Sequence, residues 1–238
     1  MSIFRFQQFD IQQSDNPLKV GTDSMVFGAL ISALGKTRAL DIGAGTGVLS
    51  LMALQQNPNL QIDAIEIHDA AARECSLNVK NSPWPSSVIV HSLDFFSFQP
   101  SETYDLIFSN PPFYMDGLKS GVEEQDQAKH MSRTSFSSFI SKAAVLLSDQ
   151  GIFSIIIPGE QRAFLLELGE QNGLVPIRIV SIHANEQKLN KRVIIEFGKI
   201  PSELITSELI IRNMDGSYHD SYIERTKSFH FTDLRKKS

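Results

Sequence analysis

The sequence predicts an α/β fold with a mostly parallel, seven-stranded sheet, helices on both faces and an antiparallel last hairpin. Short apolar runs alternate with helix-length segments along residues 39–171, which is the pattern of repeated strand–helix–strand units. Two further apolar runs, residues 175–182 and 192–197, are separated by a loop too short for a crossover helix, so we expect them to pair antiparallel. With 238 residues, 42% of them hydrophobic, the chain is long enough to bury a large core.

Each expected element is bounded by residues that start or stop regular structure. Ahead of the late hairpin, strands are expected at residues 39–42, 61–67, 88–91, 105–109 and 152–157. Helices are expected at residues 25–34, 47–56, 69–81, 135–147 and 160–171. Pro58 follows one helix, Gly151 is expected as a break after another, and Pro158 bounds the fifth strand.

The chain is expected to form a single domain with two extensions. Residues 37–200 form the core, residues 1–36 an N-terminal extension that closes over a bound ligand, and residues 201–238 a C-terminal extension. Thr22 or Asp23 is a candidate N-cap for the helix in the first extension.

Composition narrows the functional classes. The net charge is −5, which is unfavourable for a nucleic-acid binder because phosphate contacts need cations, so any such surface must be a local basic rim. Cys75 is the single cysteine, which precludes an internal disulfide and suggests a reducing, cytoplasmic setting. The first residues, Met1-Ser2-Ile3-Phe4-Arg5-Phe6, show no apolar core of a signal peptide, and no apolar run reaches the roughly 18 residues of a membrane span.

A glycine-rich loop follows the first core strand. Gly43, Gly45 and Gly47 alternate between that strand and the next helix, where missing β-carbons let the backbone approach a ligand closely. Val48 stands where a dinucleotide fingerprint would need glycine, which disfavours a nicotinamide dehydrogenase. The loop predicts a nucleotide-like cofactor, and Asp41 just before it is suited to a cationic group of that cofactor.

Carboxylates follow the second and third strands. Glu66 lies where an acidic residue accepts the two ribose hydroxyls of a nucleotide, although a solvated strand-end charge is the alternative. Asp94, with Phe95 and Phe96 directly after it, suits an adenine amino group and ring face, and at least one of the two rings is expected in the core.

The tetrapeptide Asn110-Pro111-Pro112-Phe113 follows the fourth strand and points to an amino-group substrate. An aromatic exocyclic nitrogen is a poor nucleophile, and two acceptors, the Asn110 side-chain oxygen and the Pro111 carbonyl, can hold its N–H bonds and favour pyramidalisation. The prolines stiffen the turn, and Phe113 would stack on the flat target, worth roughly 1–3 kcal/mol. With the glycine loop, the motif predicts metal-free methyl transfer from S-adenosylmethionine. By itself it leaves open adenine N6, guanine N2, cytosine N4 and a glutamine amide.

Four motifs together resemble the bacterial tRNA(Val) adenine-N6 methyltransferases in order and spacing. They are Phe6-Gln7-Gln8-Phe9, Lys19-Val20-Gly21-Thr22-Asp23, Asp41-Ile42-Gly43-Ala44-Gly45-Thr46-Gly47 and Asn110-Pro111-Pro112-Phe113. The resemblance covers nearly the whole chain, and the Lys-Val-Gly-Thr-Asp element is its narrower marker. It implies a class I methyltransferase fold, S-adenosylmethionine as donor, and the adenine just 3′ of the anticodon in a valine tRNA as target.

The resemblance also implies roles for individual residues. Cofactor-binding roles fall on Lys19, Gly21, Thr22, Asp41, Gly43, Gly45, Glu66 and Asp94, and target-base roles on Asn110, Pro111, Pro112 and Phe113. Candidate contacts to RNA phosphates are His130, Arg133, Lys188, Lys191 and Arg192, which are otherwise ordinary surface charges. No membrane or protein partner is implied.

Three alternatives compete with this interpretation. Guanine-N2 methylation of rRNA shares the motif. Glutamine-N5 methyltransferases of proteins carry an additional N-terminal helical domain, for which the residues ahead of the first core strand are too few. The third is a catalytically silent RNA-binding module, and the intact motif positions argue against it.

Overall fold

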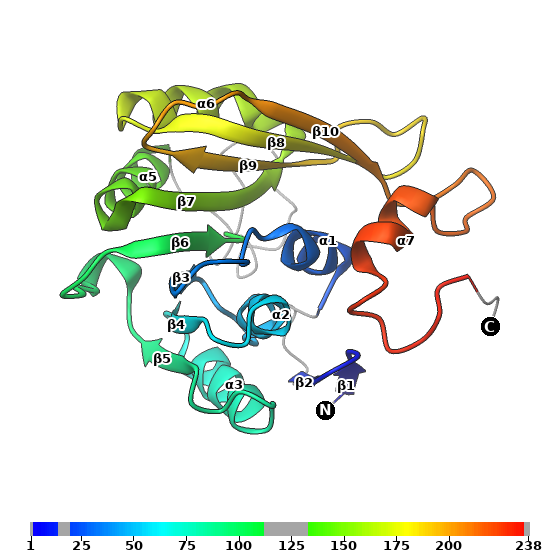
Figure 1. Cartoon of the computed structure of the whole chain (residues 1–238), viewed down its shortest axis with the longest axis horizontal. Helices are drawn as coiled ribbons and strands as arrows, with labels where there is room; N and C mark the ends of the chain where they lie inside the picture. Colours follow the sequence, from blue (N-terminus) through cyan, green and yellow to red (C-terminus); the bar gives the residue numbers. More distant parts are fainter. Residues whose placement is uncertain (1, 14–19, 112–132, 236–238) are drawn as a thin grey trace, which may run out of the picture.

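An eight-stranded sheet, in the order β10-β8-β9-β7-β6-β3-β4-β5, forms the centre of the molecule (Figure 1). The structure is a computed structural model and describes residues 2–13, 20–111 and 133–235. The strands are β3 (Arg38–Ile42), β4 (Gln61–Glu66), β5 (Val88–Ser92), β6 (Tyr104–Ser109), β7 (Leu147–Pro158), β8 (Val175–His183), β9 (Arg192–Gly198) and β10 (Ile205–Ile210). Strands β3 to β7 pair in parallel, and β9 runs antiparallel to both β7 and β8.

The predicted α/β class and the antiparallel β8–β9 hairpin are confirmed, but the prediction of seven strands was wrong. Strand β10 pairs in parallel with β8 and adds an eighth strand at the edge. Its first four residues are exposed, so no apolar run announced it within the expected C-terminal extension.

Gly151 also differs from expectation, because it lies inside β7 rather than breaking the chain before it. A β-carbon there would stand 2.6 Å from Leu147 Cδ1 and 2.9 Å from the Tyr104 carbonyl oxygen. Glycine is needed at this position because strand β6 approaches closely and shifts register there.

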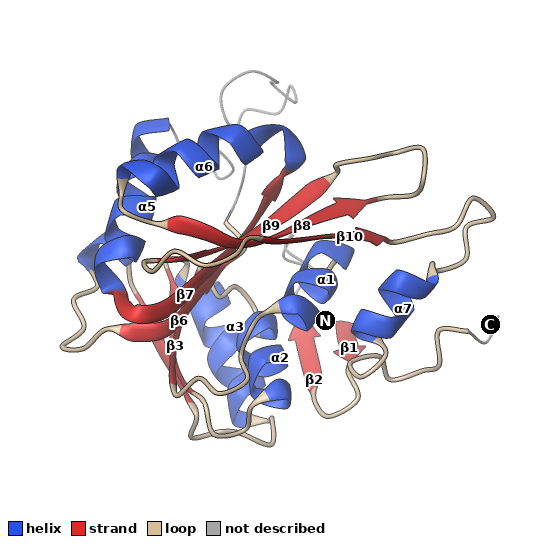
Figure 2. Ribbon diagram, turned by 45° about the horizontal axis from the view of Figure 1, so that its top comes forward, coloured by secondary structure: helices blue, strands red, loops and turns tan. Residues whose placement is uncertain are grey.

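Helices cover both faces of the sheet (Figure 2). Helices α1 (Thr22–Leu30), α2 (Val48–Gln56) and α3 (Asp69–Lys80) contribute to one buried cluster, and α5 (Arg133–Leu146) and α6 (Arg162–Gln171) to the other. Neighbouring strand residues such as Ala39 and Leu40 enter opposite clusters, as the alternation of side chains in a strand requires. The last helix, α7 (Asp220–Thr226), lies beside α1 (Figure 1).

The N-terminal extension is a small hairpin of β1 (Ser2–Arg5) and β2 (Asp10–Gln13). The Asn78 side chain on α3 accepts from the Gln12 backbone N–H at 2.8 Å and donates to the Thr46 carbonyl at 2.9 Å. One amide therefore fastens the extension to the helix and to the glycine loop together.

Helix α1 begins without a side-chain cap. Its N-cap residue is Gly21, so the prediction that Thr22 or Asp23 caps this helix was wrong. Asp23 instead accepts a hydrogen bond from the Arg192 side chain. Across the described ranges, none of the helices combines the length and apolar character that crossing a bilayer requires.

Candidate functional site

The carboxyl ends of four parallel strands lie in register along one edge of the sheet. Ser109, the last residue of β6, pairs with Ile42 at the end of β3, and Ile42 pairs with Ile65 on β4. On the other side of β4, Glu66 pairs with Ser92 of β5. Strands β4 and β5 lie on one side of β3, and β6 and β7 lie on the other, so the strand order reverses between β3 and β6. In α/β sheets, ligands bind beyond the carboxyl ends of the strands at such a topological switch point.

The predicted site residues follow these strand ends in spatial order. Asp94 comes after β5, Glu66 closes β4, Gly43 begins the loop after β3, and Asn110 comes after β6. Neighbouring strands lie about 4.8 Å apart, so the four positions span a row about 15 Å long. The fold therefore brings the expected nucleotide contacts and the expected target-base contact to one edge, with the glycine loop between them.

The glycine loop is held open by backbone hydrogen bonds. Gly43 and Ala44 both donate to the Ile65 carbonyl at 2.9 Å, which fixes the loop to β4. Gly43 and Gly45 have φ angles of 78° and 56°, and, apart from their chain neighbours, no atom of residues 2–13, 20–111 or 133–235 lies within 4 Å of where their β-carbons would stand. The empty side leaves room for a ligand against the backbone.

Gly47→Ala is expected to destabilise the fold more than Gly216→Ala, a matched control. Both glycines have positive φ, 81° and 84°, so both substitutions carry a strain of about 1–2 kcal/mol. A β-carbon on Gly47 would also stand 2.7 Å from Cys75 Sγ. A β-carbon on Gly216 would have no atom of the described residues within 4 Å, its chain neighbours aside. Urea unfolding should show an additional loss of about 1–3 kcal/mol for Gly47→Ala. Equal losses would contradict the packing of α3 against the loop.

Asp41 is a buried carboxylate with one unsatisfied oxygen. Its side chain is fully inaccessible and Oδ2 accepts from Ser50 Oγ at 2.6 Å, whereas Oδ1 has no hydrogen-bond partner among the residues that the structure describes. Burial, with a smaller contribution from the nearby Glu66 charge, raises the pKa of Asp41 from 3.8 to about 7. A buried oxygen of this kind calls for a donor or a cation from a ligand. The cationic methionine end of S-adenosylmethionine fits that requirement, so these residues fit this cofactor.

Glu66 braces the same loop. Its Oε2 accepts from the Gly45 N–H and its Oε1 from the His68 N–H, both at 2.9 Å, and its side chain is buried. Each carboxylate oxygen has two acceptor positions, so one on each remains for a ribose hydroxyl.

Asp94 and the two phenylalanines lie at the far end of the row. Asp94 is exposed and accepts from the Phe96 N–H at 3.0 Å, capping the short helix η1 (Phe95–Ser97). Phe95 is buried in the core, as expected for at least one of the pair, whereas Phe96 is 42% exposed. Ile67, directly after Glu66, is 59% exposed at this edge and was not singled out from the sequence.

Asn110 is half-buried beside the glycine loop. The preceding Ser109 donates its Oγ to the Ile42 carbonyl at 2.7 Å, which ties the end of β6 to the end of β3. Pro111 is buried directly after it. Ser109 and Ser50 support the site, and sequence reasoning missed both because a lone serine after a strand or in a helix carries no signal.

Several predicted residues lie outside the described ranges or at their borders. Lys19, Pro112, Phe113 and His130 are outside them. Gly21 and Thr22 are exposed at the start of α1, and Arg133 is the first residue of α5.

The basic residues of the β8–β9 loop do not share one environment. Lys188 and Lys191 are exposed, whereas Arg192 Nε donates to Asp23 Oδ2 at 2.9 Å. This ion pair joins the start of β9 to the start of α1. Arg192 is therefore engaged with the N-terminal extension, and the two lysines carry the charge that faces solvent.

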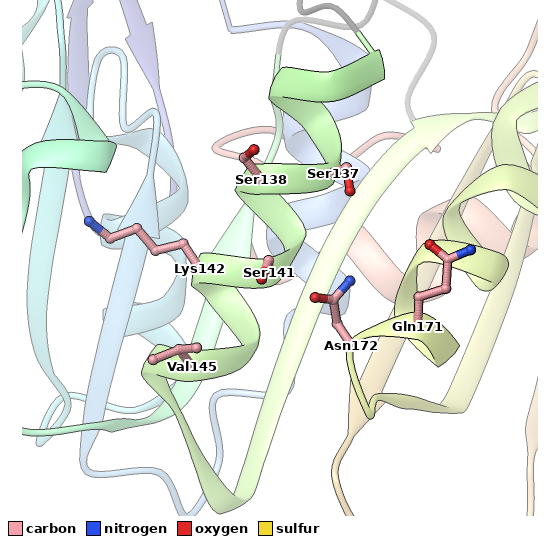
Figure 3. Close-up of a pocket in the computed structure, with 7 residues that line it drawn as sticks. All are labelled: Ser137, Ser138, Ser141, Lys142, Val145, Gln171 and Asn172. Atoms are coloured by element: carbon pink, nitrogen blue, oxygen red, sulfur yellow. The ribbon is translucent and has the colours of Figure 1, made fainter.

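A polar groove of about 620 Å³ lies away from this edge, between α5 and α6 (Figure 3). Its lining residues are Ser137, Ser138, Ser141, Lys142, Val145, Gln171 and Asn172. The Lys142 ammonium donates to the carbonyls of Phe96 and Phe98 at 2.8 and 2.7 Å, so it is already engaged. None of the predicted cofactor or target-base residues that the structure describes lines the groove, so we do not assign the site to it.

Known proteins resemble this chain in sequence and in fold. Residues 18–166 match the family model described as Methyltransferase small domain. Among solved structures, a predicted O-methyltransferase from Agrobacterium tumefaciens superposes with a TM-score of 0.66 at 16% identity, covering 87% of this chain and 96% of that one. The P. horikoshii TYW2 structure in complex with MeSAdo has a TM-score of 0.60 at 14% identity, covering 84% and 72% of the two chains. Such distant structures establish the class I methyltransferase fold.

Curated relatives are closer. A protein of Flavobacterium psychrophilum named tRNA1(Val) (adenine(37)-N6)-methyltransferase is 35% identical over 231 residues, which are 96% of this chain and 99% of that protein. A protein of the same name from Escherichia coli O1:K1 / APEC is 32% identical over 230 residues, covering 95% of this chain and 94% of the relative. These relatives cover nearly the whole chain, and the chain belongs to the family of tRNA1(Val) (adenine(37)-N6)-methyltransferases.

Proposed function

We propose that this protein methylates the exocyclic N6 of the adenine next to the anticodon in a valine tRNA, with S-adenosylmethionine as the methyl donor. The observation that carries the proposal is the placement of Asn110 at a strand end directly beside the glycine loop and the orphan oxygen of Asp41. Family membership favours adenine N6 over guanine N2, a protein glutamine or a silent module.

Each residue at the edge has a defined task in this proposal. Asp41 holds the cationic end of the cofactor, Glu66 its ribose, and Asp94 its adenine. Gly43 and Gly45 keep the loop free of side chains, so that the cofactor can lie against the backbone. Lys19, Gly21 and Thr22 would close over the methionine end from the N-terminal extension.

The target adenine is held from the β6 side. The Asn110 side-chain oxygen and the Pro111 carbonyl accept the two N–H bonds of N6, Pro112 stiffens the turn and Phe113 stacks on the ring. S-adenosylmethionine supplies an electrophilic methyl on a good leaving group, so the chain itself needs no strong base. Its contribution is to align the nitrogen with the methyl group, which places catalysis mainly in positioning.

An anticodon-loop target fits the limited positive charge of the chain. A base in that loop is already partly unpaired, so flipping it into a site costs less than from a duplex. His130, Arg133, Lys188 and Lys191 are proposed to contact loop phosphates, while Arg192 contributes through its pair with Asp23. We also propose a cytoplasmic location, which a tRNA substrate favours and which is in line with the single, buried and free cysteine.

The test is methylation of tRNA from a strain that lacks the gene. The purified protein, labelled donor and total tRNA should yield N6-methyladenosine by nucleoside mass spectrometry, and isolated valine tRNA should account for the label. Asn110→Ala protein is the matched blank. N2-methylguanosine as the product would replace the proposed target, and absence of any labelled nucleoside would favour the silent module.

A further inference from the structure

We propose that Leu189, on the arm of the β8–β9 loop that leads into β9, is a tRNA-positioning residue that inserts beside the flipped adenine and keeps the anticodon loop open. This inference rests on the proposed function. Leu189 is 61% exposed, and it stands between two exposed lysines, Lys188 and Lys191. An apolar side chain between two cations matches the face of an unstacked base between two phosphates.

The loop lies at the same edge of the sheet as Asn110. Arg192, the first residue of β9, pairs with Pro158, the last residue of β7, and β7 pairs with β6, which ends at Ser109. Arg192 is thus two strand spacings, about 10 Å, across from Ser109 and about 10 Å further along. From there the loop projects beyond the sheet (Figures 1 and 2). That separation suits a contact to nucleotides flanking the target, rather than to the target itself.

Contacts fix the backbone of the β8–β9 loop on both sides of Leu189. Asn190 has a left-handed backbone with φ of 53°, and its N–H donates to the Nδ1 of the buried His183 at 2.9 Å. The Asn190 carbonyl oxygen packs so closely on Gly159 that a β-carbon there would lie 2.1 Å away. At the other side of the loop, the Asn185 side chain accepts from the backbone N–H of Gln187 at 3.0 Å.

An exposed leucine on a fixed backbone loses less conformational entropy on binding than a leucine on a flexible loop. Because the backbone on both sides of it is hydrogen-bonded, inserting the side chain into RNA costs little ordering entropy. The Arg192–Asp23 pair fastens the base of the loop to α1, beside the expected cofactor residues Gly21 and Thr22. RNA contact at Leu189 and cofactor contact at α1 would therefore be made by joined parts of the fold.

RNA is favoured over a protein partner by charge and location. The only acid in the loop is Glu186, at the end away from β9, and the residues that flank Leu189 directly are Lys188 and Asn190. A base face needs only an apolar surface, and the phosphates beside it need the lysines.

The experiment compares Leu189→Ala with Leu34→Ala. Leu34 is 75% exposed in the connection before β3, at the opposite edge of the sheet, so it controls for loss of an exposed leucine. Leu189→Ala should lower kcat/KM for valine tRNA about tenfold, as expected for one lost apolar contact to a base, while calorimetric affinity for S-adenosylmethionine is unchanged. Leu189→Met should restore most of the activity, and Leu34→Ala should match the wild type.

A second readout separates insertion from general weakening. With 2-aminopurine in place of the target adenine, wild-type protein should raise the fluorescence as the base leaves the stack, and Leu189→Ala should lose most of that rise. Charge reversal at Lys188 and Lys191 should instead flatten the salt dependence of tRNA binding. If Leu189→Ala matches Leu34→Ala in both assays while the wild type methylates tRNA, the role of Leu189 is wrong. If the wild type methylates no tRNA, the proposed function itself fails.

Discussion

Asn110→Ala is expected to reduce the rate of methyl transfer by about a hundredfold to a thousandfold and to leave the affinity for S-adenosylmethionine nearly unchanged. The substitution removes one of the two acceptors proposed to hold the target amino group, and losing one preorganised hydrogen-bonding group at a reacting centre costs about that much. The proposed cofactor contacts follow other strands, β3, β4 and β5, so we expect them to stay in place. Single-turnover kinetics with saturating tRNA and calorimetry with the cofactor would measure the two effects separately.

Asn110→Asp is the informative companion variant. It keeps the shape and one oxygen acceptor but loses the amide and adds a charge beside Asp41 and Glu66, which already lie at this edge. We expect activity between those of the wild type and Asn110→Ala. Loss of cofactor affinity in Asn110→Ala would contradict the role of Asn110, since it would place the side chain on the cofactor rather than on the target base.

Patterns that depend on neighbours in sequence were predictable. Apart from the start of β7, which lies five residues earlier than predicted, the apolar periodicity located β3 to β9 to within two residues, and the glycine spacing located the loop that contains Gly43 and Gly45. These signals are local, because a buried parallel strand must be apolar and a tight turn at positive φ needs glycine. Asp41 was singled out for its place before the loop.

The features that were missed depend on contacts between distant segments. Strand β10 is held by backbone pairing at the edge of the sheet, where its first four side chains are exposed, so only its end is buried and the sequence pattern did not reveal it. The Arg192–Asp23 pair joins residues separated by 169 positions. The sequence suggested Arg192 as an RNA-facing cation, whereas the structure pairs it with the N-terminal extension. Ser50, which donates to Asp41, is likewise an ordinary helix residue until the fold places it.

Asp41→Asn is expected to stabilise the cofactor-free protein and to weaken S-adenosylmethionine binding on the order of a hundredfold. Burial raises the pKa of Asp41 from 3.8 to about 7, so above neutral pH the folded protein holds a poorly solvated charge with one oxygen unpartnered. An asparagine avoids that charge and still accepts from Ser50. Near pH 8 the variant should gain on the order of 2–4 kcal/mol, seen as a melting temperature higher by roughly 5–10 °C.

The sign of the pH dependence follows from the direction of the shift. In the folded state Asp41 binds its proton more tightly than in the unfolded state, so between about pH 4 and pH 7 only the unfolded state releases it. Asp41 therefore lowers the stability progressively as the pH rises through that window and by a constant amount above it. Thermal melts of the cofactor-free wild type minus those of Asp41→Asn should show this profile.

Asp63→Asn is the matched control because its carboxylate is shifted the other way. Burial raises the pKa of Asp63, but hydrogen bonds from His91, Tyr104 and Arg38 outweigh this effect and bring the pKa below its usual value. Its charge therefore contributes stability above about pH 4 that is lost as the pH falls through the lowered pKa. Asp63→Asn should destabilise the protein by about 1–3 kcal/mol and leave cofactor affinity unchanged.

Cofactor binding supplies the decisive comparison. The positive charge of S-adenosylmethionine favours ionised Asp41, so binding below pH 7 must release a proton, and wild-type affinity should rise between pH 6 and pH 8. Calorimetry at pH 6 in buffers with different ionisation enthalpies would count that proton. Asp41→Asn should release none and lose the pH dependence. A variant that keeps wild-type affinity would show that the cofactor does not use Asp41, and that the buried charge only costs stability.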